Sequence, residues 1–160
     1  MLHYRKIEPG DDEALAKIIR ANLEHFHLNI PGTAYFDPEL DHLSAFYTSD
    51  PAKRVYFVAL DEDGAVLGGG GSAEFAGLAG CAELQKLYLS DAAKGKGYGK
   101  ALTQRIEDWA RAAGYQRLYL ETHSNLSAAL KLYEKLGFYR IEKPAAAVHS
   151  TMDHFYLKEL

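Results

Sequence analysis

Residues 94–100 read Lys-Gly-Lys-Gly-Tyr-Gly-Lys and lie between a predicted strand and a predicted helix. The first turn of a helix has backbone N–H groups without intrahelical partners and a partial positive charge, so it can bind an anion. Glycines let the backbone approach that anion closely. Four basic residues nearby suit a compact anion such as a pyrophosphate: Lys94, Lys96, Lys100 and Arg105. A tight strand-to-helix connection without a ligand is the alternative interpretation of the same glycines.

Two common phosphate-binding patterns do not fit this turn. The dinucleotide pattern G-x-G-x-x-G requires a glycine where the chain has Lys100 or Leu102. The P-loop pattern G-x-x-x-x-G-K-[ST] requires a glycine in place of Lys94 and a hydroxyl in place of Ala101. The spacing therefore argues against a dinucleotide-binding oxidoreductase and against a P-loop protein.

The composition narrows the class of protein further. The 160 residues are 48% hydrophobic and 25% charged, which is typical of a soluble globular protein. The net charge of -4 argues against a general nucleic-acid surface. No apolar run approaches the roughly 18 residues of a membrane helix, and residues 1–6 lack a secretory stretch, so we expect a cytoplasmic protein. Cys81 is the only cysteine, which excludes an internal disulfide and a cysteine-based metal cage.

The elements that must position the glycine turn alternate between strands and helices. An apolar strand at 82–90 precedes the turn, a helix at 98–113 follows and ends at Gly114, and a strand at 116–122 comes next. This succession predicts a parallel strand pair with a right-handed crossover. The complete order of elements predicts an α/β (α+β) mixed sheet with helices on both faces. The other expected strands are 3–8, 55–60, 65–75, 138–142 and 153–157. Three further helices are expected: one that starts near residue 12, one at 39–47 and one at 127–136.

Four consecutive glycines, residues 68–71, interrupt the predicted strand at 65–75. Glycine inside a strand indicates a bulge or a close approach of another part of the chain. A direct contact between these glycines and a ligand is the alternative.

The region from residue 82 to about residue 142 resembles the GCN5-related N-acetyltransferase (GNAT) family. The family's acetyl-CoA signature, [QR]-x-x-G-x-[GA], matches residues 94–99, except that Lys94 takes the place of the usual glutamine or arginine. A second family-like motif, Leu-Tyr-Glu-Lys-Leu-Gly-Phe, occupies residues 132–138. The resemblance implies a single GNAT domain over residues 1–160, with a mostly antiparallel central sheet and one splayed parallel pair.

The resemblance also implies acetyl-CoA as co-substrate, with no metal. In the family, the strand before the turn pairs with the pantetheine arm, and an asparagine after the next strand often holds the cofactor. The asparagine here is one residue out of the usual register, and either it or Ser124 is alternatively a cap of the following helix. The implied cofactor-binding residues are Leu87, Tyr88, Leu89, Lys94, Gly95, Lys96, Gly97, Tyr98, Gly99, Lys100, Asn125 and Tyr133.

Two residues match the family's catalytic positions. Tyr133 matches the tyrosine that protonates the departing thiolate, although its helical spacing with Leu132 and Leu136 also fits an ordinary core aromatic. Glu83 matches an acidic residue that serves as general base, often through a water. Strand alternation predicts that Glu83 shares a face with Gln85 and Leu87 unless a bulge intervenes. Glu74 on the preceding strand, or ordered water alone, is the alternative base.

The resemblance implies transfer of the acetyl group to a primary amine by direct attack, without a covalent enzyme intermediate. Cys81 is a poor nucleophile candidate because no histidine neighbours it in the sequence. The alternative is a catalytically silent CoA-binding regulatory or interaction module. The acceptor is not identified, nucleic-acid and membrane partners are not expected, and dimers are common in the family.

The histidines show no metal-ligand spacing, and we expect them to be ordinary surface or core residues. They include His25, His27, His42, His123, His149 and His154. Of these, His123 and His154 lie near strand ends that can face an acceptor. Tyr35 and Phe36 belong to the loop that lines the acceptor pocket in the family.

Overall fold

One seven-stranded sheet, of order β1-β2-β3-β4-β5-β7-β6, organises residues 3–160, which are the residues that the computed structural model describes. Only β4 and β5 pair in parallel, and every other neighbouring pair is antiparallel, so the predicted mixed sheet is confirmed. The strands are β1 (His3–Lys6), β2 (Val55–Leu60), β3 (Val66–Glu74), β4 (Cys81–Leu89), β5 (Arg117–Thr122), β6 (Tyr139–Ile141) and β7 (His154–Glu159). The α-helices are α1 (Asp12–His25), α2 (Leu43–Thr48), α3 (Tyr98–Ala112) and α4 (Ser127–Lys135).

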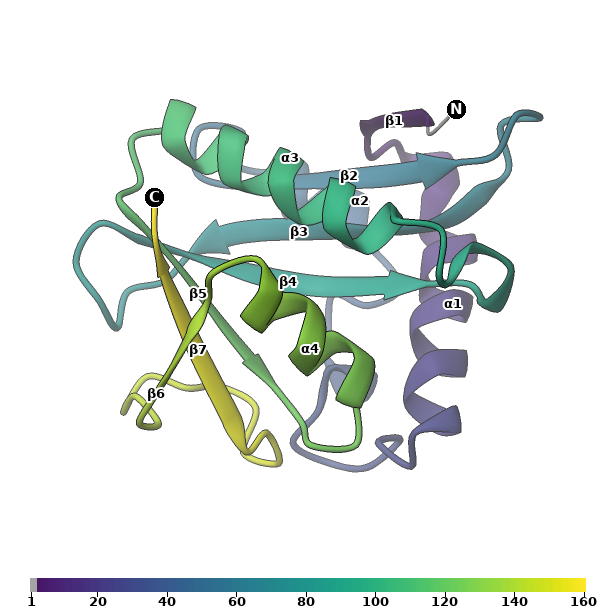
Figure 1. Ribbon diagram of the computed structural model, residues 1–160. Helices are drawn as coiled ribbons and strands as arrows, with labels where there is room; N and C mark the ends of the chain where they lie inside the picture. Colours follow the sequence, from purple (N-terminus) through teal and green to yellow (C-terminus); the bar gives the residue numbers. More distant parts are fainter. Residues whose placement is uncertain (1–2) are drawn as a thin grey trace.

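Helices cover both faces of the sheet, with α3 and α4 on one face and α1 and α2 on the other (Figure 1). The alternation of β2 shows how one strand serves both layers. Phe57 and Ala59 pack with α3, whereas Tyr56 and Val58 pack with α1 and α2. No helix within residues 3–160 is long and apolar enough to cross a bilayer.

The predicted order of elements is confirmed, and the predicted boundaries lie within two residues of the observed ones, except for the start of one helix. The helix expected near 39–47 begins only at Leu43, as α2. The preceding residues form turns, in which Leu40 N donates to Asp37 O (3.1 Å) and His42 N donates to Glu39 O (2.8 Å). These turns leave the side chains of Asp37 and Glu39 free to meet a buried lysine, Lys86.

The glycines of β3 are needed because the Tyr56 ring lies against them, which confirms the predicted close approach. A Cβ added at Gly71 would lie 2.6 Å from Cδ2 of Tyr56 and 2.8 Å from the Val55 carbonyl oxygen. A Cβ at Gly69 would overlap the same ring. The Tyr56 hydroxyl reaches further and donates to the backbone carbonyl of Lys86 on β4 (2.9 Å).

A β-bulge interrupts β4 at Lys86. Gly69 pairs with Tyr88 and Gly71 with Gln85, so two residues of β4 stand opposite Gly70. Lys86 adopts φ +50°, a left-handed conformation that costs a non-glycine residue about 1–2 kcal/mol. The Tyr56 hydrogen bond and the ion pairs of the Lys86 ammonium hold the chain in this conformation.

Candidate active site

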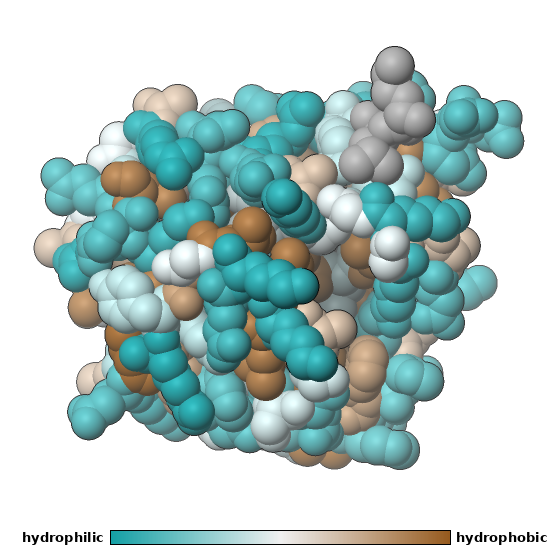
Figure 2. All heavy atoms as spheres, in the orientation of Figure 1, coloured by the Kyte–Doolittle hydropathy of each residue, from teal (hydrophilic) through white to brown (hydrophobic). Residues whose placement is uncertain are grey.

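A cavity of about 490 Å³ opens where β4 and β5 separate. The two strands pair only from Cys81 to Glu83 and from Arg117 to Tyr119, and beyond these residues they diverge, with α4 lying across the gap (Figure 1). Figure 2 shows apolar side chains in the recess between α3 and α4, with hydrophilic side chains around it. The cavity is lined by β4 from Glu83 onward, the glycine turn, the end of β5, and parts of α1, α4 and the loops that contribute Leu28, Ala34, His149 and Met152.

The glycine turn forms one end of this cavity. Gly95 (φ +76°) and Gly97 (φ +86°) adopt left-handed conformations, and Gly97 is the N-cap of α3. A Cβ at either position would meet no atom within 4 Å, so both glycines face open space. Gly99 allows close packing instead, because a Cβ added there would lie 3.1 Å from the Leu132 side chain of α4. The turn therefore combines an open helix N-terminus with close packing between α3 and α4.

Nine of the twelve residues predicted to bind the cofactor line the cavity, and three do not. Those that line it are Leu87, Tyr88, Leu89, Lys94, Gly95, Gly97, Gly99, Lys100 and Tyr133. Lys96 is not part of the cavity wall, and neither is Tyr98, which packs edge-on against Tyr4 with ring centroids 6.0 Å apart. The cofactor contacts of all twelve stay predictions.

Asn125, the third residue outside the cavity wall, joins two elements. Its side-chain amide donates to the carbonyl of Phe26 (2.9 Å) at the end of α1. The predicted capping role is wrong for Asn125 and also for Ser124, whose hydroxyl donates to Asp153 (2.8 Å). Leu126 is the N-cap of α4, without a side-chain cap. The amide of Asn125 therefore fixes the loop between β5 and α4 to the edge of the cavity.

Tyr133 lines the cavity from α4. The residue is 6% exposed, and its ring packs against Phe138 and Tyr156, at centroid distances of 5.7 and 6.5 Å. Within residues 3–160 the hydroxyl has no hydrogen-bond partner. Burial, with a smaller contribution from Tyr88, raises the pKa of this phenol above its ordinary value. Tyr133 is therefore both a core aromatic and a protonated donor available to a ligand.

Glu83 has a buried carboxyl group that forms no ion pair with a basic side chain in residues 3–160. It is 7% exposed and lines the cavity, and burial raises its pKa to about 7. Its Oε1 accepts a hydrogen bond from Gln85 (2.8 Å), which Tyr47 in turn orients through its hydroxyl (2.7 Å). No cation within residues 3–160 forms an ion pair with Glu83. A carboxyl group with these properties suits a general base near neutral pH.

The bulge decides which way the side chains of β4 point. Glu83 and Gln85 share the face of α1 and α2, as alternation predicts. Leu87 packs instead with the core on the α3 side, because the extra residue Lys86 reverses the alternation. The sequence left open whether a bulge intervenes, and the structure shows that one does, so Leu87 does not share the face of Glu83.

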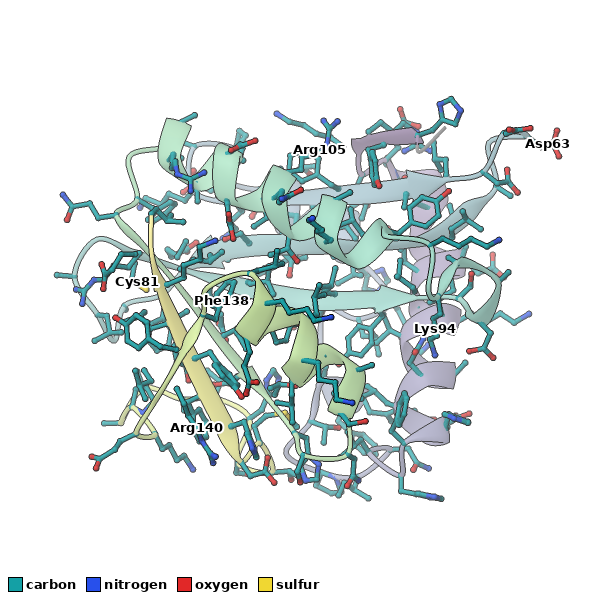
Figure 3. All side chains as sticks on the ribbon, viewed as in Figure 1. Asp63, Cys81, Lys94, Arg105, Phe138 and Arg140 are labelled. Atoms are coloured by element: carbon teal, nitrogen blue, oxygen red, sulfur yellow. The ribbon has the colours of Figure 1, made fainter. Side chains whose placement is uncertain are left out.

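Glu74 and Cys81 lie outside the cavity wall. Arg54 holds the Glu74 carboxylate with two hydrogen bonds (2.6 and 3.0 Å), which lower the pKa of that carboxyl. Burial raises the pKa of the Cys81 thiol to about 11. Figure 3 shows Cys81 and Lys94 near opposite ends of β4. A base at Glu74 and a thiolate nucleophile at Cys81 are both disfavoured by this placement.

His149, from the loop between β6 and β7, joins two carboxylates at the cavity wall. Its Nε2 lies 2.9 Å from Asp37 and its Nδ1 lies 2.9 Å from Glu121 on β5. Burial alone would lower the pKa of His149, but the hydrogen bonds and charges of Asp37 and Glu121 raise it to about 9. The two carboxylates therefore favour the protonated imidazole, a role that the spacing of the histidines in the sequence did not indicate.

Lys86 is the second buried cation near the cavity. Its ammonium lies 2.8 Å from Asp37 and 3.0 Å from Glu39. Burial alone would lower its pKa, but the two carboxylates outweigh that effect and raise it. Asp37 thus bridges Lys86 and His149, and it ties the loop after α1 to both β4 and the β6–β7 loop.

Other residues singled out in the sequence lie elsewhere. His123 and His154 both contact Asp153 (3.7 and 2.7 Å) and are not part of the cavity wall. Tyr35 donates to Glu24 (2.6 Å) and Phe36 is 60% exposed, while their neighbour Ala34 lines the cavity. No group of three or more His, Cys, Asp or Glu side chains in residues 3–160 is arranged to hold a metal ion.

Comparison with known proteins identifies this arrangement as an acetyltransferase fold. A crystal structure of a GNAT-family acetyltransferase from Staphylococcus aureus Mu50 matches with a TM-score of 0.88 at 17% identity, covering 100% of this chain and 99% of that one. The PaiA N-acetyltransferase from Thermoplasma acidophilum, solved with coenzyme A, matches with a TM-score of 0.78 at 19% identity, covering 100% and 99%.

The sequence model of the acetyltransferase (GNAT) family matches residues 19–138. The uncharacterized N-acetyltransferase YjgM of Escherichia coli (strain K12) is 38% identical over 140 residues, which are 86% of this chain and 82% of that protein. The chain belongs to the acetyltransferase (GNAT) family. Membership confirms the enzyme class predicted from the glycine turn, an acetyl-CoA-dependent N-acetyltransferase.

Proposed function

We propose that this chain, as one catalytic domain over residues 1–160, transfers the acetyl group of acetyl-CoA to a primary amine by direct attack. One observation carries the proposal. A single cavity joins the glycine turn to the unpaired carboxylate of Glu83 and to the unpartnered hydroxyl of Tyr133. The same cavity can therefore hold the diphosphate of the cofactor and contains two groups that can transfer protons.

The cofactor end binds acetyl-CoA mainly through backbone groups. The diphosphate lies at the N-terminus of α3, where the open space before Gly95 and Gly97 admits it and the N–H groups and the helix dipole favour it. Lys94 and Lys100 line the same end and add positive charge. The pantetheine arm extends along Leu87, Tyr88 and Leu89, where β4 has no partner strand on the side of β5.

The proton transfers follow from the two buried side chains. Glu83, with a pKa of about 7, takes a proton from the acceptor ammonium, directly or through a water. The neutral amine attacks the thioester carbonyl carbon, the C–S bond breaks as the tetrahedral intermediate collapses, and Tyr133 protonates the departing thiolate. The nitrogen of the new amide loses its second proton to solvent, solvent reprotonates Tyr133, and Glu83 releases the proton that it accepted. The ammonium and the thioester become an acetamide, free CoA thiol and one released proton.

Thiol release from acetyl-CoA in the presence of a panel of primary amines tests this proposal, with mass spectrometry of the acetylated product. We expect turnover with at least one amine and binding of CoA in calorimetry. Binding of CoA with no turnover on any amine would instead identify a catalytically silent CoA-binding module. Absence of CoA binding would remove the proposal altogether.

A further inference from the structure

The end of the cavity that is remote from the glycine turn has an unusual distribution of charge. Leu89 lies six positions along the strand from Glu83, which corresponds to roughly 20 Å at about 3.3 Å per residue. Three further carboxylates, Asp37, Glu39 and Glu121, lie near Glu83, whereas the ion pairs within residues 3–160 place two cations there, Lys86 and His149. When Glu83 is ionised, this end of the cavity therefore carries an excess of two negative charges.

Both cations are already engaged by protein carboxylates. Lys86 contacts Asp37 and Glu39, and His149 contacts Asp37 and Glu121, all at 2.8–3.0 Å. A carboxylate on the acceptor would find no free cation here, and it would lie close to Glu83 and Glu121. Burying an unpaired charge is costly, so such an acceptor is disfavoured. An ammonium group, in contrast, has Glu83 as an available partner.

Apolar side chains surround this charged spot. Leu28 and Ala34 line the cavity from the loop after α1, and Met152 lines it from the loop between β6 and β7. These side chains bury the body of an acceptor but offer it no hydrogen bonds. The combination favours a cationic head on an apolar body.

The same two loops close the acceptor end from outside. Thr151 donates through its hydroxyl to Pro31 O (2.7 Å) and through its backbone N–H to Gly32 O (3.1 Å). Contact is so close that a Cβ at Gly32 would lie 2.5 Å from the hydroxyl oxygens of Ser150 and Thr151. Figure 1 shows the two loops meeting beside the C-terminal end of β5. These direct hydrogen bonds hold the two loops together at Thr151, which disfavours the insertion of a polypeptide between them at this point.

We propose that the acceptor is a small primary amine with an apolar body and no carboxylate, such as an alkylamine or an arylalkylamine. This inference rests on the proposed function and narrows its substrate. Glu83 binds the ammonium before it accepts the proton, and the paired Lys86 and His149 leave the site without a receptor for an α-carboxylate. Free α-amino acids and peptide N-termini are therefore poor substrates.

Matched pairs of acceptors test the inference. Phenethylamine is compared with phenylalanine and isoamylamine with leucine, and phenylalaninamide adds bulk at the α-carbon without a charge. A short peptide with a free N-terminus represents the polypeptide class. The readout is kcat/KM for thiol release at saturating acetyl-CoA. We expect each amine to exceed its amino acid by at least about tenfold, with phenylalaninamide above phenylalanine.

A variant shows whether charge causes the discrimination. Glu39→Gln removes one of the two carboxylates that engage Lys86, so we expect the amine-to-amino-acid ratio to fall by at least about threefold. Asp41→Asn is the matched control, because Asp41 lies in the same loop but pairs with Arg20 on the surface. We expect the ratio of this control to equal that of the unmodified protein.

The outcomes separate the inference from the proposed function. Amino acids or the peptide used as well as the amines would overturn the acceptor class and leave acetyl transfer standing. An unchanged ratio in Glu39→Gln would overturn the charge argument. No thiol release with any acceptor, while CoA binds in calorimetry, would overturn the proposed function and the inference with it.

Discussion

The two ends of the cavity are built in different ways. The cofactor end is local, since seven consecutive residues, 94–100, supply the turn and the first residues of α3. The acceptor end draws on four separate segments that contribute Asp37, Glu83, Glu121 and His149. Backbone conformation forms the first end, and buried charges form the second. If the proposed function holds, a cofactor seat made of backbone can stay the same while the side chains at the other end of the cavity change.

The largest effect that we expect is on kcat, from removal of the Tyr133 hydroxyl, which lies between the two ends of the cavity. Tyr133→Phe should lower kcat by about 10³-fold, because it removes a general acid, while CoA affinity changes less than twofold. The ring packing is kept and no hydrogen bond within residues 3–160 is lost, so the melting temperature should not fall.

Tyr156→Phe is the matched control for this variant. Its hydroxyl donates to Glu134 (3.1 Å) and is not part of the cavity wall, so kcat should stay within about twofold. Equal turnover in the unmodified protein and in Tyr133→Phe would remove the acid role of Tyr133.

The acceptor end should make the stability of the protein depend on pH. The pKa of His149 is about 9 in the folded protein and about 6.5 in the unfolded chain, so its stabilisation is complete below pH 6.5 and is lost as the pH rises through 9. Linkage converts this difference into at most about 3 kcal/mol. Urea unfolding at pH 6.5 and 9.5 measures the loss.

His149→Gln should remove most of this pH dependence, whereas His42→Gln, which changes an exposed histidine, should retain it. An equally steep loss in His149→Gln would assign the pH dependence to other groups.

Glu83 should determine how the rate depends on pH. Because burial raises its pKa to about 7, kcat/KM for an amine should increase as the pH rises through 7 and the carboxylate forms. Glu83→Gln should lower kcat/KM by about 30-fold and abolish this inflection. A retained inflection in Glu83→Gln would show that another group, or water alone, accepts the proton.

The smallest effect that we expect is on CoA affinity, from replacement of Gly97. A control variant separates the cost of backbone strain from the loss of a ligand contact. Gly97→Ala should weaken CoA binding by about tenfold, measured by calorimetry, because a methyl group enters the space of the diphosphate. Gly114→Ala is the matched control, since Gly114 also has a left-handed conformation (φ +92°) with open space, but at the other end of α3. Both variants should lose similar stability, and only Gly97→Ala should lose affinity. Equal affinities would contradict the cofactor seat.

The glycine turn and the elements around it could be predicted from the sequence because the residues that form them are adjacent. Gly95 and Gly97 adopt the left-handed conformations that only glycine adopts readily, and the flanking strand and helix follow from hydrophobic periodicity. The parallel pair β4–β5 was predictable for the same reason, since a strand, helix and strand in succession require a crossover.

The acceptor end could not be predicted, because its contacts join distant residues. Asp37 and His149 are 112 residues apart, and neither lies in a motif. The side chains of His123 and His149 look alike in a sequence, and only the β6–β7 loop brings His149 to the cavity wall. The carboxylates near Lys86 gave no signal either, since the same letters occur in solvated turns.

The bulge at Lys86 divides β4 into two parts whose side chains alternate in opposite register. Before the bulge, the odd-numbered Glu83 and Gln85 point to the face of α1 and α2. After it, the odd-numbered Leu87 and Leu89 pack in the core on the α3 side. Nine residues thus supply reactive side chains in the first half and a hydrophobic lining in the second. Deleting one residue at the bulge would move every later side chain of β4 to the opposite face of the sheet. The number of residues in β4 therefore matters for the cavity as much as their identity does.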